Sequence, residues 1–158
     1  MLQTARPNAK IEVRNLTKKF NDLVVLDHVN FTVNDGEMVA IVGPTGCGKT
    51  TFLNCMSKLM DATEGDIFID GVPADPKKHN LAFVFQEPTA LPWRTVEQNV
   101  VYGMEIKGVP KKERDERLQY ILGLVGLTDT AKLYPNQISA SMMQRIAVAR
   151  AFAVNPDL

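Results

Sequence analysis

The octapeptide from Gly43 to Thr50, Gly-Pro-Thr-Gly-Cys-Gly-Lys-Thr, fits the phosphate-binding pattern G-x-x-x-x-G-K-[ST] at every constrained position. The apolar run at 38–42 predicts a buried parallel strand before it, and the run at 51–56 predicts a helix after it. Glycines let such a loop curl, so that its N–H groups and the positive end of the helix face a bound phosphate. The order of strand, loop and helix therefore predicts an α/β fold with a nucleotide site.

Two side chains of this loop are predicted to take part in chemistry. Lys49 is expected to reach the β- and γ-phosphates, and the Thr50 hydroxyl is suited to Mg²⁺, which prefers oxygen ligands. We therefore predict a bound nucleoside triphosphate with Mg²⁺, and Lys49 as a catalytic residue. The loop residues expected to contact the nucleotide are Gly43, Pro44, Thr45, Gly46, Cys47, Gly48, Lys49, Thr50 and Thr51.

Composition limits the partners of the chain. It has 158 residues with 18 basic and 18 acidic side chains, so no overall charge favours nucleic acid or an anionic membrane. The N-terminus has no apolar leader, and no stretch approaches the roughly 18 apolar residues of a membrane span. We expect a cytoplasmic protein that reaches a membrane only through a protein partner. Cys47 and Cys55 do not resemble a disulfide framework or a metal-ligand pair.

The first part of the chain is rich in strand patterns. The pair Asp70-Gly71 after one of them is a strong hairpin-turn signal. Strands are predicted at 11–16, 29–33, 66–69 and 81–85.

From Val96 onward the pattern becomes helical. Apolar residues at helical spacing predict one amphipathic helix from Lys111 to Val125. A last helix is predicted from about Ser139, a good N-cap residue, to Val154. Its inward apolar line is expected to consist of Ile146, Ala149 and Ala153.

Two further motifs follow the phosphate loop. Gln86 comes directly after the predicted strand at 81–85 and opens the segment Gln-Glu-Pro-Thr-Ala-Leu-Pro-Trp-Arg-Thr-Val. The segment Ile138 to Arg145, Ile-Ser-Ala-Ser-Met-Met-Gln-Arg, stands at the start of the last predicted helix. With Phe20 ahead of the loop, these features resemble the ATP-binding cassette (ABC) ATPases. The chain looks most like importer subunits that serve nitrate, sulfonates, taurine and similar small solutes.

The resemblance implies roles for these residues. Phe20 would stack on adenine with Val25 beside it, and Gln86 would contribute to catalysis as a ligand of Mg²⁺ that senses the γ-phosphate. Ser139 would bind the γ-phosphate held by a second subunit, because the family forms two sites in a head-to-tail dimer. The implied cofactors are ATP and Mg²⁺. The implied partners are that second ATPase subunit and a membrane-spanning permease, which would hold the chain at the inner face of the membrane.

The chain departs from the family pattern at two positions. Ala140 and Ser141 replace two signature glycines and place Cβ atoms where backbone should approach phosphate. Either this signature works with reduced efficiency or it closes a weak site, and the sequence leaves both alternatives open.

The implied fold is a P-loop core of the ABC ATPase type with an N-terminal antiparallel β-subdomain and a helical subdomain. The expected parts are a nucleotide-binding β-subdomain and loop core at 1–86, a helical subdomain contacting the permease at 87–137, and the signature helix at 138–158. The sequence ends before the Walker B strand and its Asp-Glu pair, so we expect an N-terminal fragment.

The main hypothesis is therefore the ATP-binding subunit of an ABC importer, coupling ATP hydrolysis to solute uptake. The alternatives are a non-hydrolytic regulatory module that binds nucleotide and a truncated product without function. A small P-loop kinase and a cassette ATPase of translation or DNA repair are further alternatives, but the motifs around Gln86 and Ser139 favour the importer type. Whether this chain alone hydrolyses ATP is left open, because the Walker B acidic pair is absent from it.

Overall fold

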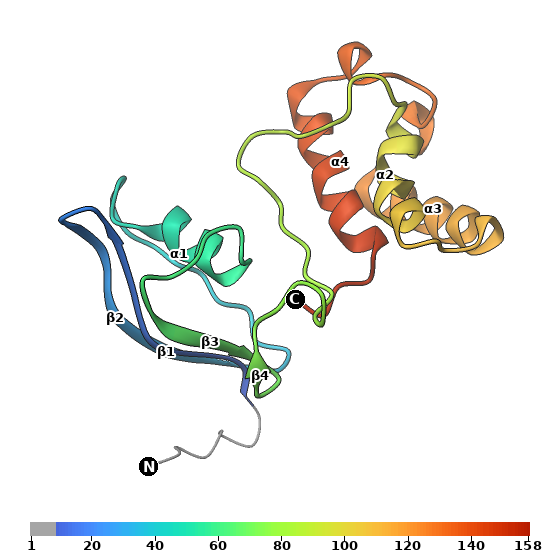
Figure 1. Ribbon diagram of the computed structural model, residues 1–158. Coiled ribbons are helices and arrows are strands. Elements are labelled where there is room, and N and C mark those ends of the chain that lie inside the picture. The colour runs from blue at the N-terminus through green and yellow to red at the C-terminus, as the bar shows by residue number, and fades with distance from the viewer. Residues whose placement is uncertain (1–8) are drawn as a thin grey trace. The chain divides into compact units, whose positions relative to one another are not determined.

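The computed structural model describes residues 9–158 and divides the chain into two compact units, Met1–His79 and Asn80–Leu158. The described part of the first unit consists of strands and one α-helix, and the second unit consists of helices and loops (Figure 1). Residues 1–8, where we expected no apolar leader, lie outside the described residues. No helix within 9–158 has the length and apolar character needed to cross a membrane.

An antiparallel sheet forms the first unit. Its strand order is β2-β1-β3-β4, and the neighbouring strands pair in registers such as Ile11 with Val33 and Ile11 with Ile69. Its strands are β1 (Ala9–Phe20), β2 (Leu23–Asn34), β3 (Glu64–Ile69) and β4 (Val72–Pro73). The strands predicted at 11–16, 29–33 and 66–69 are confirmed, although β1 and β2 are longer than predicted.

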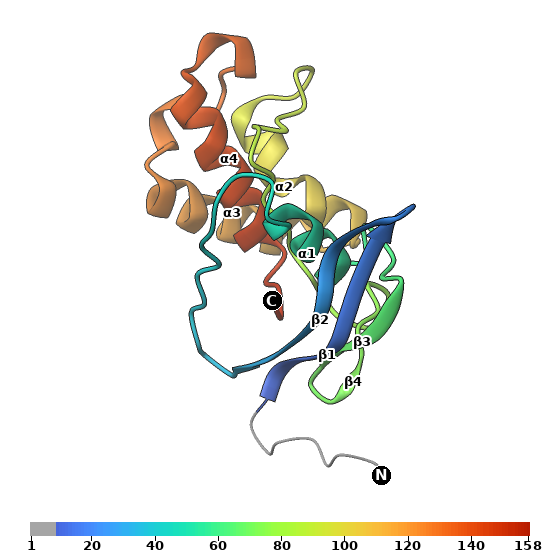
Figure 2. The ribbon, with the colours of Figure 1, turned by 90° about the vertical axis from the view of Figure 1, so that its left-hand side faces the viewer.

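Helix α1 (Lys49–Met56) covers one face of this sheet (Figure 2). The ring of Phe52 on α1 meets that of Phe31 on β2, with the ring centroids 5.2 Å apart. The buried apolar side chains of this unit are Ile11, Val13, Leu16, Leu26, Val33, Phe52, Cys55, Ile67, Ile69 and Ala74. Because strands and helix share this core, α1 and the loop before it are held against β2.

The turn between β3 and β4 has the predicted residues and conformation. Asp70 and Gly71 both have positive φ, 50° and 74°. Two positive φ angles are what a tight hairpin turn of this kind requires, and Asp-Gly supplies them at low cost. The turn prediction is therefore confirmed.

The buried strand predicted at 38–42 is wrong. These residues are irregular, and the side chains of Met38 and Val42 are 97% and 87% exposed. A parallel strand exists only where a neighbour accepts and donates its backbone hydrogen bonds, and none of the described strands pairs with this segment.

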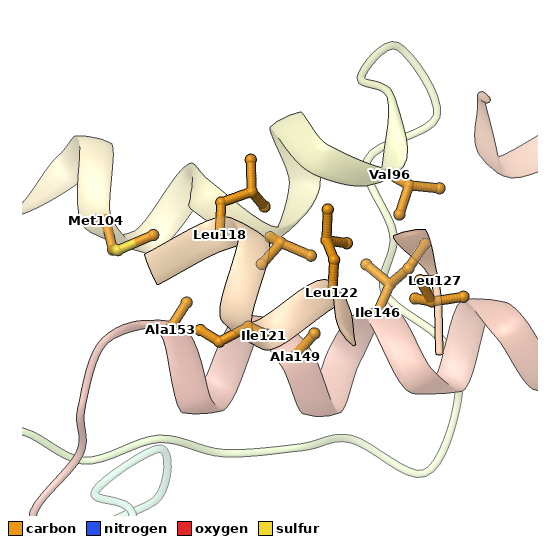
Figure 3. Close-up of a cluster of buried hydrophobic side chains, with 10 residues drawn as sticks. Val96, Met104, Leu118, Ile121, Leu122, Leu127, Ile146, Ala149 and Ala153 are labelled. Carbon is orange, nitrogen blue, oxygen red and sulfur yellow. The ribbon is translucent and has the colours of Figure 1, made fainter. Parts of the chain in front are cut away.

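Three α-helices and two short 3₁₀ helices form the second unit. They are α2 (Val96–Ile106), α3 (Lys111–Val125), η1 (Thr128–Thr130), η2 (Pro135–Gln137) and α4 (Ala140–Ala153). The three α-helices enclose one apolar cluster (Figure 3). Its buried members are Val96, Val100, Met104, Leu118, Ile121, Leu122, Leu127, Ile146, Ala149 and Ala153.

The helix predictions in this unit are confirmed. Helix α3 has the predicted bounds, Lys111–Val125. Helix α4 has Ser139 as its N-cap, whose hydroxyl accepts a hydrogen bond from the Met142 N–H. The predicted inward line of α4, Ile146, Ala149 and Ala153, is fully buried. Local capping and periodicity were sufficient here because both signals lie within one helix.

The strand predicted at 81–85 is also wrong. The segment is irregular, and Val84 and Phe85 are exposed. Backbone pairing begins at its N-terminal end, where Asp157 N–H donates to Asn80 O and Ala82 N–H donates to Leu158 O. Two bonds are too few to define a strand, which explains the difference from the prediction. The predicted parts at 1–86, 87–137 and 138–158 stay predictions.

Candidate nucleotide-binding site

The phosphate loop leads into α1 with an uncapped helix start. Gly48 is the N-cap residue, with φ 99°, and it offers no side chain to the N–H groups of the first turn. Gly46 also has positive φ, 83°. The first N–H groups of a helix have no partner within the helix, and they carry the positive end of its dipole. This start is therefore suited to an anion such as phosphate.

Gly48 packs closely against β2. A Cβ at Gly48 would lie 3.0 Å from the Val25 carbonyl oxygen and 3.1 Å from Leu26 Cδ2. A Cβ at Gly43 would lie 2.8 Å from Sγ of the exposed Cys47, a side-chain atom that can move away. The backbone contact at Gly48 is the rigid one, and β2 thus forms the back of the loop at Val25.

The ammonium group of Lys49 lies over the loop backbone. Its Nζ donates hydrogen bonds of 2.8 Å to both the Gly43 and Pro44 carbonyl oxygens, and it is 3.6 Å from Cys47 Sγ. These contacts hold one positive charge at the mouth of the loop, next to the positive end of α1. Two neutral carbonyl groups bind an ammonium group more weakly than a charged phosphate does, so a bound phosphate can replace them as the hydrogen-bond partner of Lys49.

The donor set at this loop fits Mg²⁺ bound together with a nucleotide. The Thr50 residue, in the first turn of α1, is exposed. Within residues 9–158, no group of three or more His, Cys, Asp or Glu side chains could hold a metal ion by itself. Mg²⁺ at Thr50 would therefore take its other ligands from phosphate oxygens and water, as this ion commonly does.

Phe20 lies at the end of β1 with an exposed ring. The side chain is 43% exposed, and Lys18 Nζ lies 5.1 Å from the ring centroid. This exposure argues against a simple core role for the ring. Its predicted contact with adenine stays a prediction.

Gln86 and Ser139 belong to the second unit, where the structure connects their segments. Gln86 is exposed in the loop before α2, and Gln144 on α4 donates a 3.3 Å hydrogen bond to the carbonyl of the preceding residue, Phe85. Ser139 is exposed at the start of α4. The helix that begins with the signature motif thus contacts the segment that carries Gln86.

The two residues that replace signature glycines adopt ordinary helical backbone. Ala140 and Ser141 are the first residues of α4, and neither is among the residues with positive φ. The Ser141 hydroxyl lies 2.9 Å from the Ser139 hydroxyl. These replacements therefore cost no backbone strain, and what they add at this surface is their side-chain atoms.

Sequence reasoning missed two polar residues that organise the loop before α2. Asn99 on α2 is fully buried, and its Oδ1 accepts hydrogen bonds of 2.7 Å from both the Leu91 N–H and Arg150 Nη2. Arg150 on α4 also donates from Nη1 to the Thr89 carbonyl at 3.0 Å. Burial lowers the pKa of the Arg150 guanidinium from its ordinary value. The available signal was an asparagine on the apolar face between Val96 and Val100.

A comparison with protein families agrees with this geometry. Residues 26–158 match the family model described as ABC transporter, a range that runs from β2 through the phosphate loop to the end of α4 and beyond. The chain belongs to the ABC transporter family. Within that family it resembles ATP-binding subunits, many of which belong to importers.

Three relatives illustrate how far this similarity extends. An uncharacterized ABC transporter ATP-binding protein of Methanocaldococcus jannaschii is 41% identical over 157 residues, which are 97% of this chain and 59% of that protein. The sulfate/thiosulfate import ATP-binding protein CysA of Synechocystis is 38% identical over 151 residues, covering 94% of this chain and 42% of that protein. A dimeric ATP-binding cassette solved in a post-hydrolysis state with ADP and Pi aligns with a TM-score of 0.81 at 33% identity, over 92% of this chain and 70% of that one.

The chain is shorter than these relatives. It spans about three fifths of the length of the Methanocaldococcus jannaschii protein. The solved ATPase structure confirms the predicted ABC ATPase fold class.

Proposed function

We propose that this ABC transporter chain is the N-terminal part of an importer ATPase subunit, which binds ATP with Mg²⁺ at the phosphate loop and couples its hydrolysis to uptake of a small solute. The observation that carries the proposal is the helix start at Lys49. There an uncapped turn of N–H groups, close backbone packing at Gly48 and a positioned ammonium group meet. All three act on one bound polyphosphate.

Different residues are proposed to bind the phosphates, the Mg²⁺ ion and the adenine. The backbone N–H groups of Gly46 to Thr50 surround the phosphates, and Lys49 leaves its two carbonyl partners to neutralise charge on the β- and γ-phosphates. Thr50 and Gln86 are proposed as Mg²⁺ ligands. When bound there, Mg²⁺ would neutralise negative charge on the phosphates. Phe20 and Val25 are proposed to hold the adenine.

Two partners are proposed from the same reasoning. A second ATPase subunit in head-to-tail arrangement would place Ser139 against its γ-phosphate, and the related cassette solved as a dimer with ADP and Pi supports this. The helical part at 87–137 would contact a membrane-spanning permease, which places the subunit at the inner face of the membrane. The solute is proposed to be small, of the kind carried by nitrate, sulfonate and taurine importers, and relatives named for import of sulfate/thiosulfate and of other small solutes support a small cargo.

The proposal is tested by ATP-dependent dimerisation of the full-length protein. The mass is measured by size-exclusion chromatography with light-scattering detection, with MgATP, with MgADP and without nucleotide. The MgATP sample is kept under conditions that slow ATP hydrolysis. We expect the mass to double with MgATP alone. A protein that binds MgATP but stays monomeric would contradict the head-to-tail arrangement, and one that binds no MgATP would contradict the site.

A further inference from the structure

The loop before α2 exposes a tryptophan from a backbone that is held in place. Trp93 is the single tryptophan of the chain, and its side chain is 71% exposed. We call residues 89–95 the Trp93 loop. Exposed aromatic side chains are common anchors in protein interfaces, and a fixed backbone lowers the entropic cost of using them.

The side-chain amide of Asn99 contacts the backbone of the Trp93 loop with both its nitrogen and its oxygen. Its Nδ2, with two N–H groups, lies within hydrogen-bond distance of three carbonyl oxygens, those of Leu91, Arg94 and Thr95, at 3.1, 3.0 and 3.0 Å. Its Oδ1 accepts from the Leu91 N–H. A fully buried amide that contacts three carbonyls and one N–H of one short loop determines the path of that loop.

Arg150 connects this assembly to α4. One nitrogen of its guanidinium bonds Asn99 Oδ1 at 2.7 Å, and another bonds the Thr89 carbonyl at 3.0 Å. The planar guanidinium makes these contacts from two separate nitrogens, Nη1 and Nη2, held in a fixed fork. The single nitrogen of a lysine at this position does not reproduce that spacing. The far end of the loop is fixed to α2, where Arg94 bonds Glu105 at 2.6 Å and lies over the Tyr102 ring.

We propose that Arg150 and Asn99 are positioning residues that couple the signature helix α4 to the Trp93 loop, so that a movement of α4 moves Trp93 with it. The inference rests on the proposed function for the cause of that movement, which is ATP at the signature end of α4. The mechanical connection itself follows from contacts within the second unit.

The experiment compares three variants of the full-length protein. Arg150→Lys keeps the charge and the buried stem but loses one of the two contacts, and Arg150→Met loses both. Arg117→Met is the matched control, since Arg117 also bonds an α4 carbonyl, that of Phe152 at 3.3 Å, without touching the loop. Hydrogen exchange of the Leu91 amide and the fluorescence anisotropy of Trp93 report on the loop. Trp93→Phe provides the background from any other tryptophan.

We expect Leu91 exchange to rise roughly tenfold or more in Arg150→Met, less in Arg150→Lys, and not in Arg117→Met. Trp93 anisotropy should fall in the same order. MgATP affinity should stay within about twofold of wild type in Arg150→Lys, while the Trp93 response to MgATP is lost. Loss of a residue with only a general structural role would lower the MgATP affinity together with the Trp93 anisotropy change that MgATP causes.

Two results would overturn the inference. One is an Arg150→Lys variant whose Leu91 exchange rate and Trp93 anisotropy equal those of wild type. This variant tests the connection even if Arg150→Met does not fold. The other is an equal Trp93 response to MgATP in wild type and Arg150→Lys. A wild-type protein that binds no MgATP would refute the proposed function and, with it, the ATP-driven coupling, whereas the exchange data would still decide the connection between α4 and the loop.

Discussion

Replacing Gly48 by alanine adds one methyl group where the phosphate loop packs against the backbone of β2. An alanine at positive φ costs about 1–2 kcal/mol. The new Cβ would also lie 3.0 Å from the Val25 carbonyl oxygen and 3.1 Å from Leu26 Cδ2, and such overpacking costs about 1–3 kcal/mol more. We therefore expect a total loss of about 2–5 kcal/mol, and a weakened MgATP affinity because the loop must move away from β2.

Gly36→Ala is the control for this experiment. Gly36 has positive φ, 74°, but a Cβ there would meet nothing within 4 Å, and the residue lies outside the loop. It should lose only the strain of about 1–2 kcal/mol, with MgATP affinity unchanged. At roughly 2–4 °C per kcal/mol, Gly48→Ala should melt at least a few degrees below Gly36→Ala in calorimetry of the full-length protein. Equal melting temperatures and equal affinities would refute the packing argument for Gly48.

Three further predictions concern the site. Lys49→Ala should weaken MgATP binding in titration calorimetry by at least roughly tenfold, because a charged hydrogen-bond donor to phosphate is removed; unchanged affinity would make the site assignment wrong. The double substitution Ala140→Gly with Ser141→Gly should raise ATPase turnover of the full-length protein by freeing space for phosphate, and no increase would mean that this pair is not a defect. Iodoacetamide should modify the exposed Cys47 well before Cys55, which is 1% exposed and whose pKa is raised by burial. MgATP should slow the reaction at Cys47. Mass spectrometry that finds Cys55 modified first would contradict the burial of Cys55.

The features that could be predicted from the sequence are those encoded within a few residues. Ser139 caps α4 through a hydrogen bond three residues away, and Asp70-Gly71 needs only its own two φ angles. The pattern of the phosphate loop is equally local. Such signals do not depend on what the rest of the chain does.

The features that could not be predicted depend on distant partners. The segments 38–42 and 81–85 have the composition of buried strands, but a strand requires neighbours that the described residues do not provide. Asn99 and Arg150 are 51 residues apart, and each alone looks like an ordinary polar residue on a helix. Their joint hold on the Trp93 loop exists only after α2 and α4 have packed.

Binding of ATP at the loop from Gly43 to Thr51 can be followed residue by residue. An NMR titration of ¹⁵N-labelled full-length protein with MgATP reports on the backbone amide of each residue. We expect saturable shifts that are largest at the amides of Gly46 to Thr50, whose N–H groups are proposed to face the phosphates. Saturable shifts centred elsewhere, or none in this loop at millimolar MgATP, would contradict binding of ATP at this loop.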